Sequence, residues 1–164
     1  MTRIARPRPP LIYNPNELRT DHRFMKTPDT RRQVSEAIAA CLDKKAEELS
    51  VLELEKDSGA FTDYFVICSG TNPRQIQAIA DEVELRLKKA GLYPSHIEGY
   101  RQAEWVLLDY VDFVVHVFAE HARRYYELER LWKSARRLEP ADLKTAARAP
   151  RKRSAAGTAK RKRA

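Results

Sequence analysis

The sequence lacks any run of about 18 apolar residues, the length that a membrane-spanning helix requires. Its first ten residues are rich in arginine and proline, and they contain no apolar stretch long enough for a secretory signal. Arginine without acidic residues is also typical of organellar transit peptides, but the prolines argue against the amphipathic helix that such peptides form. We therefore expect a cytoplasmic protein that does not bind membranes.

Cysteine and histidine are also scarce, with two and four residues. The histidines lie far apart in the sequence, at His22, His96, His116 and His121. Neither Cys-x-x-Cys nor His-Glu-x-x-His occurs, so we expect no structural zinc site, no other metal and no cofactor. Cys41 falls in a helical pattern and Cys68 in a strand pattern, and we interpret both as small buried apolar residues in a reducing compartment.

The net charge of +8 is unevenly distributed along the chain. Residues 1–33 hold eight Lys and Arg against three acidic residues, and residues 141–164 hold nine against one. Residues 34–140 hold fourteen against nineteen, a net charge of −5. The central part is therefore acidic and both ends are basic, which suggests an anionic neighbour such as RNA.

Composition divides the chain into three parts. Residues 1–28 are rich in Pro, Arg and Asn without any period, which predicts a flexible basic arm. Residues 141–164 are Ala/Lys/Arg low complexity with little apolar surface, which predicts a disordered basic tail. Residues 29–140 are left as one folded domain.

Three helical patterns lie within 29–140. Residues 30–33 match a capping box, and a first apolar stripe follows: Val34, Ile38, Cys41, Leu42, Ala46 and Leu49. Asn72 and Pro73 predict the start of a second helix and Gly91 its end. Its stripe is Ile76, Ile79, Ala80, Val83, Leu87 and Ala90. A third stripe predicts a last helix that ends before Pro140: Tyr125, Leu128, Leu131, Trp132 and Ala135.

Strand patterns occupy residues 51–54, 64–68, 104–108 and 113–118. The run at 64–68 is continuously apolar, which is typical of a strand covered on both faces. Residues 109–112 suit a hairpin turn between the last two strands. Helices packed on a largely buried mixed β-sheet predict an α/β fold.

Two segments are candidates for chemistry. At residues 69–74 a strand leads into a helix, where backbone N–H groups and Arg74 could face a phosphate. A single glycine, without a Walker or Gly-x-Gly-x-x-Gly pattern, favours an ordinary helix start. Asp109 and Asp112 could hold magnesium, but aspartates are common in turns because of local hydrogen bonds. No nucleophile–base pair stands out, and we predict a protein that is not an enzyme.

His116 interrupts an apolar strand and, if buried, requires a hydrogen-bond partner, so we interpret it as a structural core histidine. In the preceding strand, alternation places Trp105, Leu107 and Asp109 on one face and Val106, Leu108 and Tyr110 on the other. A tryptophan near a carboxylate is typical of a protein-binding hot spot, whereas large aromatics are usually mostly buried. These residues alone leave Trp105 open between core and interface.

A set of ordered landmarks spans about residues 34–135. They are Thr62–Thr71, Arg74-Gln75, Ile79–Asp81, Gly91–Pro94, Glu98-Gly99, Trp105–Tyr110, Val115–Phe118 and Arg123–Trp132. No single block is decisive, but the ordered set is highly specific. In this set the sequence resembles the ribosomal silencing factor family, also called Iojap-like.

The resemblance implies binding to the large ribosomal subunit through its protein fourteen, at the face where the small subunit docks. Subunit joining is thereby blocked, and translation falls when nutrients are scarce. The resemblance also implies a nucleotidyltransferase-like fold without the catalytic pattern, a dimer in the free state, and a role of organellar relatives in large-subunit assembly. It would place Trp105, Leu107, Asp109 and Tyr110 at the contact, with Glu98 and Gly99 at its edge.

Two alternatives stay open: a nucleotidyltransferase-like enzyme, and an RNA-binding protein driven by its basic ends. Independently of these, we expect the tail at 141–164 to touch ribosomal RNA without sequence preference, in which case its contribution falls steeply with salt. A merely solubilising tail is the other interpretation.

Overall fold

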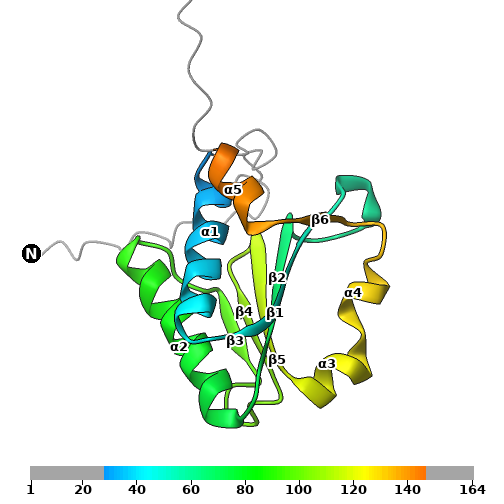
Figure 1. The fold of residues 1–164 in the computed structure, drawn as a ribbon. Coiled ribbons are helices and arrows are strands. Elements are labelled where there is room, and N and C mark those ends of the chain that lie inside the picture. Colours follow the sequence, from blue (N-terminus) through cyan, green and yellow to red (C-terminus); the bar gives the residue numbers. More distant parts are fainter. Residues whose placement is uncertain (1–27, 147–164) are drawn as a thin grey trace, which may run out of the picture.

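The computed structural model describes residues 28–146, in which helices flank a mixed sheet on both sides (Figure 1). In chain order the elements are α1 (Pro28–Asp43), β1 (Glu47–Glu53), a 3-10 turn (Lys56–Ser58), β2 (Tyr64–Gly70), α2 (Pro73–Lys89), β3 (His96–Glu98), β4 (Trp105–Asp109), β5 (Phe113–Ala119), α3 (Glu120–Tyr126), α4 (Leu128–Leu131), β6 (Arg136–Leu138) and α5 (Pro140–Ala146). The strand order is β3-β4-β5-β2-β1-β6, with β2 and β5 parallel and the other neighbours antiparallel. The predicted α/β fold is therefore confirmed.

The central strand β2 is buried along its whole length because helices cover both faces of the sheet there. On one face α1 and α2 lie side by side and, with α5, enclose the larger core (Figure 1). On the other face Ala122 of α3 and Leu128 of α4 share a smaller core with Phe65 and Ile67 of β2. We call these the α1–α2 face and the α3–α4 face. Because α3 and α4 are short, side chains of β4 on the α3–α4 face stay partly exposed.

The first helix differs from its prediction at both ends. α1 begins at Pro28, so Thr30 lies buried inside its first turn and the predicted capping box is wrong. At the other end Lys45 has a φ of +59° and the N–H of Ala46 donates to the Cys41 carbonyl, which closes the helix. The predicted stripe therefore stops at Cys41, followed by exposed Leu42 and by Ala46 and Leu49 outside the helix.

The second helix is confirmed. The Asn72 side chain caps α2 by accepting a hydrogen bond from the Gln75 N–H at 2.9 Å, and Pro73 is the first helical residue. The predicted stripe is buried from Ile76 to Leu87. Gly91, with a φ of +82°, follows the C-cap and ends the helix.

The predicted last helix is wrong, because two short helices and a strand replace it. α3 and α4 meet at Glu127, whose φ of +44° interrupts the helix. Tyr125 is 81% exposed and Leu131 74% exposed, so neither belongs to a buried stripe. Pro140 starts α5, and Leu143 of α5 is buried in the α1–α2 core. The predicted disordered tail therefore cannot begin at residue 141, and Pro28, the last residue of the predicted arm, belongs to α1. The rest of the tail and of the arm lies outside the described residues.

The two cysteines are free and buried in the α1–α2 core, as predicted. A hydrogen bond to Cys68 and burial raise the pKa of the Cys41 thiol. Within residues 28–146 no helix has the length and hydrophobicity needed to cross a bilayer. The same residues contain no group of three or more His, Cys, Asp or Glu side chains placed to hold a metal ion.

Candidate protein-docking site

The strand β4 divides its side chains between the two faces as its alternation predicts. Val106, Leu108 and Tyr110 are buried on the α1–α2 face. Trp105, Leu107 and Asp109 lie on the α3–α4 face and are partly exposed. The strand therefore presents an indole, an isobutyl group and a carboxylate in a row on this face.

Trp105 is held on three sides. Its indole Nε1–H donates to Nδ1 of His116 on the neighbouring strand β5, at 3.1 Å. Its ring stacks on Phe118, with centroids 4.9 Å apart and an angle of 24° between the planes. Tyr126 of α3 contacts it at a centroid distance of 4.7 Å. Trp105 is thus both packed and partly exposed, which unites the two interpretations that the sequence leaves open.

His116 is 3% exposed and neutral, because burial lowers its pKa to about 3. Since Nδ1 accepts the Trp105 hydrogen bond, the ring proton lies on Nε2. Nε2 has no hydrogen-bond partner, and the imidazole meets the Phe65 ring edge to face, with centroids 4.7 Å apart. The predicted core histidine is confirmed, with one of its two nitrogens paired.

The edge strand β3 adds the predicted residue Glu98, and the predicted Gly99 follows directly after it. Glu98 lies opposite Leu107 and His96 opposite Asp109, so both exposed side chains share the α3–α4 face with them. Gly99 has a φ of +74°, and a β-carbon there would meet the carbonyl oxygen of Trp105 at 2.0 Å. Gly99 therefore shapes the backbone that leads to Trp105 and offers no side chain for binding.

Asp109 has a local partner, as the turn interpretation predicts. Its Oδ1 accepts a hydrogen bond from the N–H of Val111 at 2.8 Å. The N–H of Asp112 donates to the Tyr110 carbonyl at 2.9 Å, so a three-residue turn is centred on Val111, which is exposed with a φ of +71°. The carboxylate closes the hairpin and remains partly exposed at its end.

Tyr110 does not fit the role that the resemblance implies. Its side chain is 4% exposed on the α1–α2 face, and its ring stacks on Phe113 with centroids 4.9 Å apart. Burial raises its pKa, with a smaller contribution from the charge of Glu84, and its hydroxyl has no hydrogen-bond partner. The core therefore holds this side chain on the opposite face from Trp105, and only the other predicted side chains share the Trp105 face.

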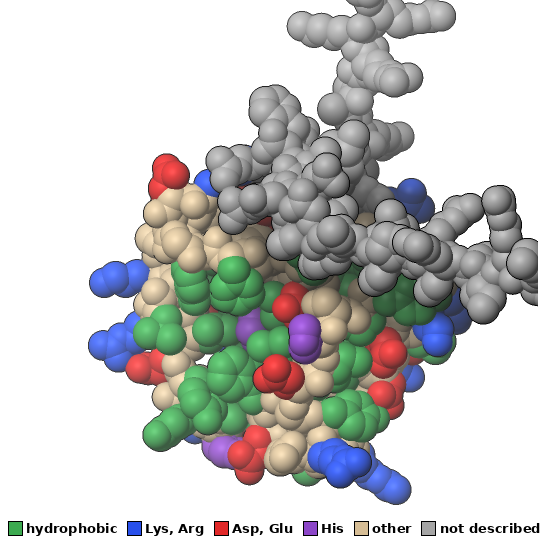
Figure 2. Space-filling model, turned by 180° about the vertical axis from the view of Figure 1, so that it is seen from behind, with side chains coloured by type: hydrophobic (Ala, Val, Ile, Leu, Met, Phe, Trp, Pro, Cys, Tyr) green, Lys and Arg blue, Asp and Glu red, His purple; other side chains and the backbone are tan. Residues whose placement is uncertain are grey.

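Several exposed apolar side chains on α3, on α4 and in the loop before β2 were not predicted as part of the site. They are Phe61, Tyr125, Tyr126 and Leu131. Figure 2 shows hydrophobic side chains gathered on the face seen from behind, with acidic and histidine side chains among them and most Lys and Arg toward the periphery. Among the ring contacts within residues 28–146, Tyr126 is the residue of α3 that contacts Trp105. The predicted last helical stripe, which begins at Tyr125, did not indicate this contact, because α3 ends at Tyr126.

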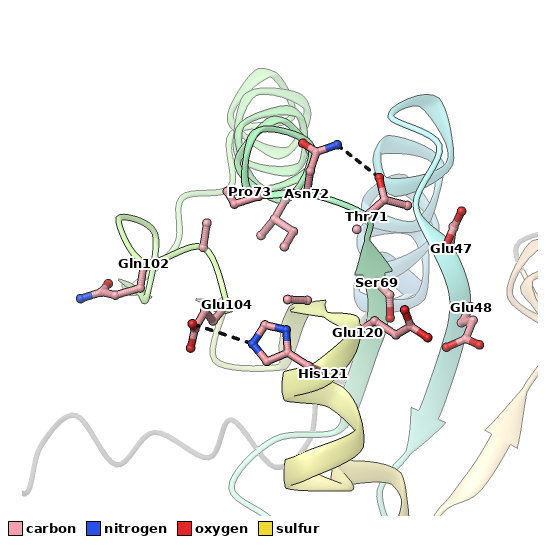
Figure 3. Close-up of a pocket in the computed structure, with 14 residues that line it drawn as sticks. Glu47, Glu48, Ser69, Thr71, Asn72, Pro73, Gln102, Glu104, Glu120 and His121 are labelled. Carbon is pink, nitrogen blue, oxygen red and sulfur yellow. Dashed lines mark hydrogen bonds and ion pairs between the residues drawn. The ribbon is translucent and has the colours of Figure 1, made fainter.

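A hollow of about 480 Å³ lies at the carboxyl ends of the parallel strands β2 and β5 (Figure 3). Four carboxylates line it: Glu47, Glu48, Glu104 and Glu120. His121 lies 3.8 Å from Glu104 across its rim. Residues 69–74, the candidate phosphate site in the sequence, border this hollow. The four carboxylates would repel a phosphate. An ordinary capped helix start is therefore the better interpretation of this segment.

Comparison with known proteins decides the family. The model of the family described as ribosomal silencing factor during starvation matches residues 27–164. The chain belongs to this family. A ribosomal silencing factor of Bacillus subtilis is 46% identical over 99 residues, which cover 60% of this chain and 83% of that protein. The predicted resemblance is therefore confirmed.

Two further relatives of this chain are informative. A mouse protein named mitochondrial assembly of ribosomal large subunit protein 1 is 32% identical over 92 residues, covering 54% of this chain and 40% of that protein. A crystal structure of a Chromobacterium violaceum protein superposes with a TM-score of 0.60 at 33% identity, covering 63% of this chain and 85% of that one. The names of the bacterial and mouse relatives describe silencing or assembly of ribosomes and not a reaction.

The structure brings together four of the predicted contact side chains. Trp105, Leu107, Asp109 and Glu98 share one accessible surface on the α3–α4 face, which we call the β4 surface. Gly99 supports it through the backbone, and Tyr110 lies outside it.

Proposed function

We propose that this protein binds the large ribosomal subunit through protein fourteen of that subunit and thereby keeps the small subunit from joining. The observation that carries the proposal is Trp105, a partly exposed aromatic ring held by a hydrogen bond and ring contacts beside Leu107 on the partly exposed face of β4. Rigid aromatic side chains at the centre of an apolar surface are typical hot spots of protein interfaces. The proposed site of action is the cytoplasm under nutrient limitation.

The mechanism requires no chemical step, because a domain bound at the docking face of one subunit excludes the other by its volume. A standard interface buries about 800 Å² on each partner, an area within reach of a domain of this size. Residues 34–140 carry a net charge of −5, and the β4 surface contributes Glu98 and Asp109. Negative charge would steer the domain toward a basic ribosomal protein.

Co-sedimentation with purified large subunits tests the proposal. Trp105→Ala is expected to weaken binding by about 30-fold or more, as loss of a hot-spot side chain does. Leu85→Ala is the matched control, since Leu85 is an exposed apolar residue of α2 on the other side of the sheet. Wild-type binding and wild-type inhibition of subunit joining by a folded Trp105→Ala variant would refute the docking site.

Two substitutions of Asp109 separate its charge from its turn. Asp109→Asn keeps an acceptor for the Val111 N–H but removes the charge, whereas Asp109→Arg reverses the charge and breaks the turn. We expect slower association and weaker salt dependence for Asp109→Asn, and loss of binding for Asp109→Arg. Unchanged association of both variants would exclude electrostatic steering by this residue.

A second role in large-subunit assembly is favoured by the name of the mouse relative. The same β4 surface would then hold a subunit precursor. Accumulation of incomplete large subunits in cells that produce only Trp105→Ala, with normal profiles in cells that produce Leu85→Ala, is the expected result. Normal profiles in both would limit the function to mature subunits.

The basic residues after 146 are proposed to contact ribosomal RNA, and the free protein to form a dimer. A chain shortened after residue 146 is expected to show a smaller salt dependence of subunit binding than the full chain. Equal salt dependence contradicts the RNA contact. Analytical ultracentrifugation of the free full-length chain tests the dimer.

The enzyme and the RNA-binding alternatives each have a direct test. A nucleotidyltransferase-like enzyme would bind ATP with magnesium in an equilibrium titration, and a general RNA-binding protein would be displaced from large subunits by naked RNA. We expect neither result, because the proposed subunit binding depends on the β4 surface, which is apolar and acidic and would not attract ATP or RNA.

A further inference from the structure

The side chain of His116 makes one hydrogen bond, and its partner is the indole N–H of Trp105. His116 lies on β5 directly beneath the β4 surface, opposite Leu107 and diagonal to Trp105. It is 3% exposed, and its ring contacts on this face are with Phe65, Phe118 and Trp105.

A histidine is an unfavourable choice for this position if it serves packing alone. Its second nitrogen, Nε2, is buried without a hydrogen-bond partner, and burying a polar group in that state destabilises a fold. An apolar side chain of similar volume would avoid this loss. The feature that a histidine supplies here, and a leucine would not, is an acceptor directed at Trp105.

The other two contacts of Trp105 do not define the direction of its indole. Phe118 stacks below the ring, and Tyr126 contacts it from α3 at an angle of 46° between the planes. Both contacts would survive a flip of the indole about its long axis, which places Nε1 on the other side. The hydrogen bond to Nδ1 favours one of these orientations, so it decides which edge of the ring faces outward.

We propose that His116 is a positioning residue, which fixes the orientation of Trp105 on the β4 surface before the ribosomal protein binds. The inference rests on the proposed function, since Trp105 must take part in docking for its orientation to matter. A side chain that is already ordered loses less conformational freedom on binding, so the complex gains affinity without any contact of His116 with the partner.

The test compares two substitutions of His116 in the full-length chain. His116→Leu removes the acceptor and keeps a similar volume, whereas His116→Asn places Oδ1 where Nδ1 stood. We expect His116→Leu to bind large subunits roughly five- to tenfold more weakly, the effect of one lost hydrogen bond, and His116→Asn to recover most of this loss. The indole Nε1–H resonance of Trp105, read by ¹⁵N NMR, should shift in His116→Leu and return toward its wild-type position in His116→Asn.

Leu52→Ala is the matched control for stability. Leu52 is buried in the same core of the α3–α4 face, but on β1, two strands away from β5. It should destabilise the fold and leave both the affinity and the Trp105 resonance unchanged. Trp105→Phe completes the comparison because it keeps an aromatic ring without the N–H. In the Trp105→Phe background, His116→Leu should cause no further loss of affinity.

The outcomes separate this inference from the proposed function. Wild-type affinity of His116→Leu, together with weak binding of Trp105→Ala, overturns the positioning role and leaves the docking site in place. Wild-type affinity of Trp105→Ala overturns both. If His116→Leu does not fold, wild-type binding by Trp105→Phe still overturns the role of the indole N–H.

Discussion

The α-carbon of Gly99 lies against the carbonyl oxygen of Trp105, so closely that a β-carbon at Gly99 would stand 2.0 Å from that oxygen. The φ of +74° at Gly99 adds a second reason for glycine, because other residues adopt it only with strain. The N–H of Ala103 donates to the Gly99 carbonyl at 3.0 Å and closes the loop between β3 and β4. The docking tryptophan therefore depends on a residue that offers no side chain.

Gly99→Ala should destabilise the domain by about 2 kcal/mol or more, because the methyl group meets backbone and the positive φ is strained. Binding to the large subunit should also weaken, since the backbone of Trp105 must move. Urea unfolding and co-sedimentation measure the two effects. Gly59→Ala is the control, because Gly59 also has a positive φ but an open space around it, so only the strain should appear. Equal losses of stability in the two variants would contradict the close contact.

Val111→Gly should stabilise the domain by about 0.5–1 kcal/mol. A β-branched residue at a φ of +71° is strained, and Val111 is too exposed for its side chain to offset that strain by burial. The gain is reduced by the greater freedom of glycine in the unfolded chain. Val111→Ala, which keeps a β-carbon but no branch, should gain less. A lower urea midpoint for Val111→Gly would show that Val111 makes a stabilising contact in the folded protein.

Arg123→Met should destabilise the domain by about 2–3 kcal/mol, because Arg123 is a nearly buried cation with several partners. Its side chain is 10% exposed, donates to Ser69 Oγ at 2.8 Å and pairs with Glu129 at 2.6 Å. These bonds join α3 and α4 to the end of β2. Amide hydrogen exchange in α3 and α4 should therefore accelerate in the variant.

Arg124→Met is the matched control for this substitution. Arg124 is the next residue, its side chain is 75% exposed, and it pairs with Glu120 one turn earlier. Such an exposed pair contributes about 0.5 kcal/mol or less. Similar unfolding free energies of the two variants would show that the contacts of Arg123 with Ser69 and Glu129 add no stability.

Stability should fall in mild acid because of His116. Its pKa is about 3 in the folded protein and about 6.5 when unfolded, so below pH 6.5 the unfolded chain binds a proton that the folded one excludes. The contribution of neutral His116 to the free energy of unfolding is fully present above pH 6.5. It is lost at up to about 1.4 kcal/mol per pH unit as the pH falls toward 3. His116→Asn does not titrate, so its free energy of unfolding should approach that of the wild type between pH 7 and pH 5. A constant difference over this range would contradict a neutral buried His116.

The elements that the sequence predicts well are those whose signals are local. The apolar run of β2 and the Asn72–Pro73 start of α2 each follow from neighbouring residues, and both are confirmed. The short elements β3 and β6 could not be predicted, because three-residue strands gain their hydrogen bonds from partners elsewhere in the chain. β6 pairs with β1, and a helical stripe was predicted just before it. The break at Glu127 likewise has no local signal in the sequence. It accompanies the packing of both Ala122 and Leu128 on the sheet.

The sequence by itself determined the order of helices and strands in the centre of the chain, the family, and the division of β4 into two faces, because alternation and capping are properties of adjacent residues. Only the tertiary structure decided which face of β4 is covered. It buries Tyr110 under α2 and leaves Trp105 partly open, because α3 and α4 are too short to cover the β4 side of their face. It also pairs Trp105 with His116, since a hydrogen bond across neighbouring strands depends on their register, and the register is fixed by the packing of the whole sheet.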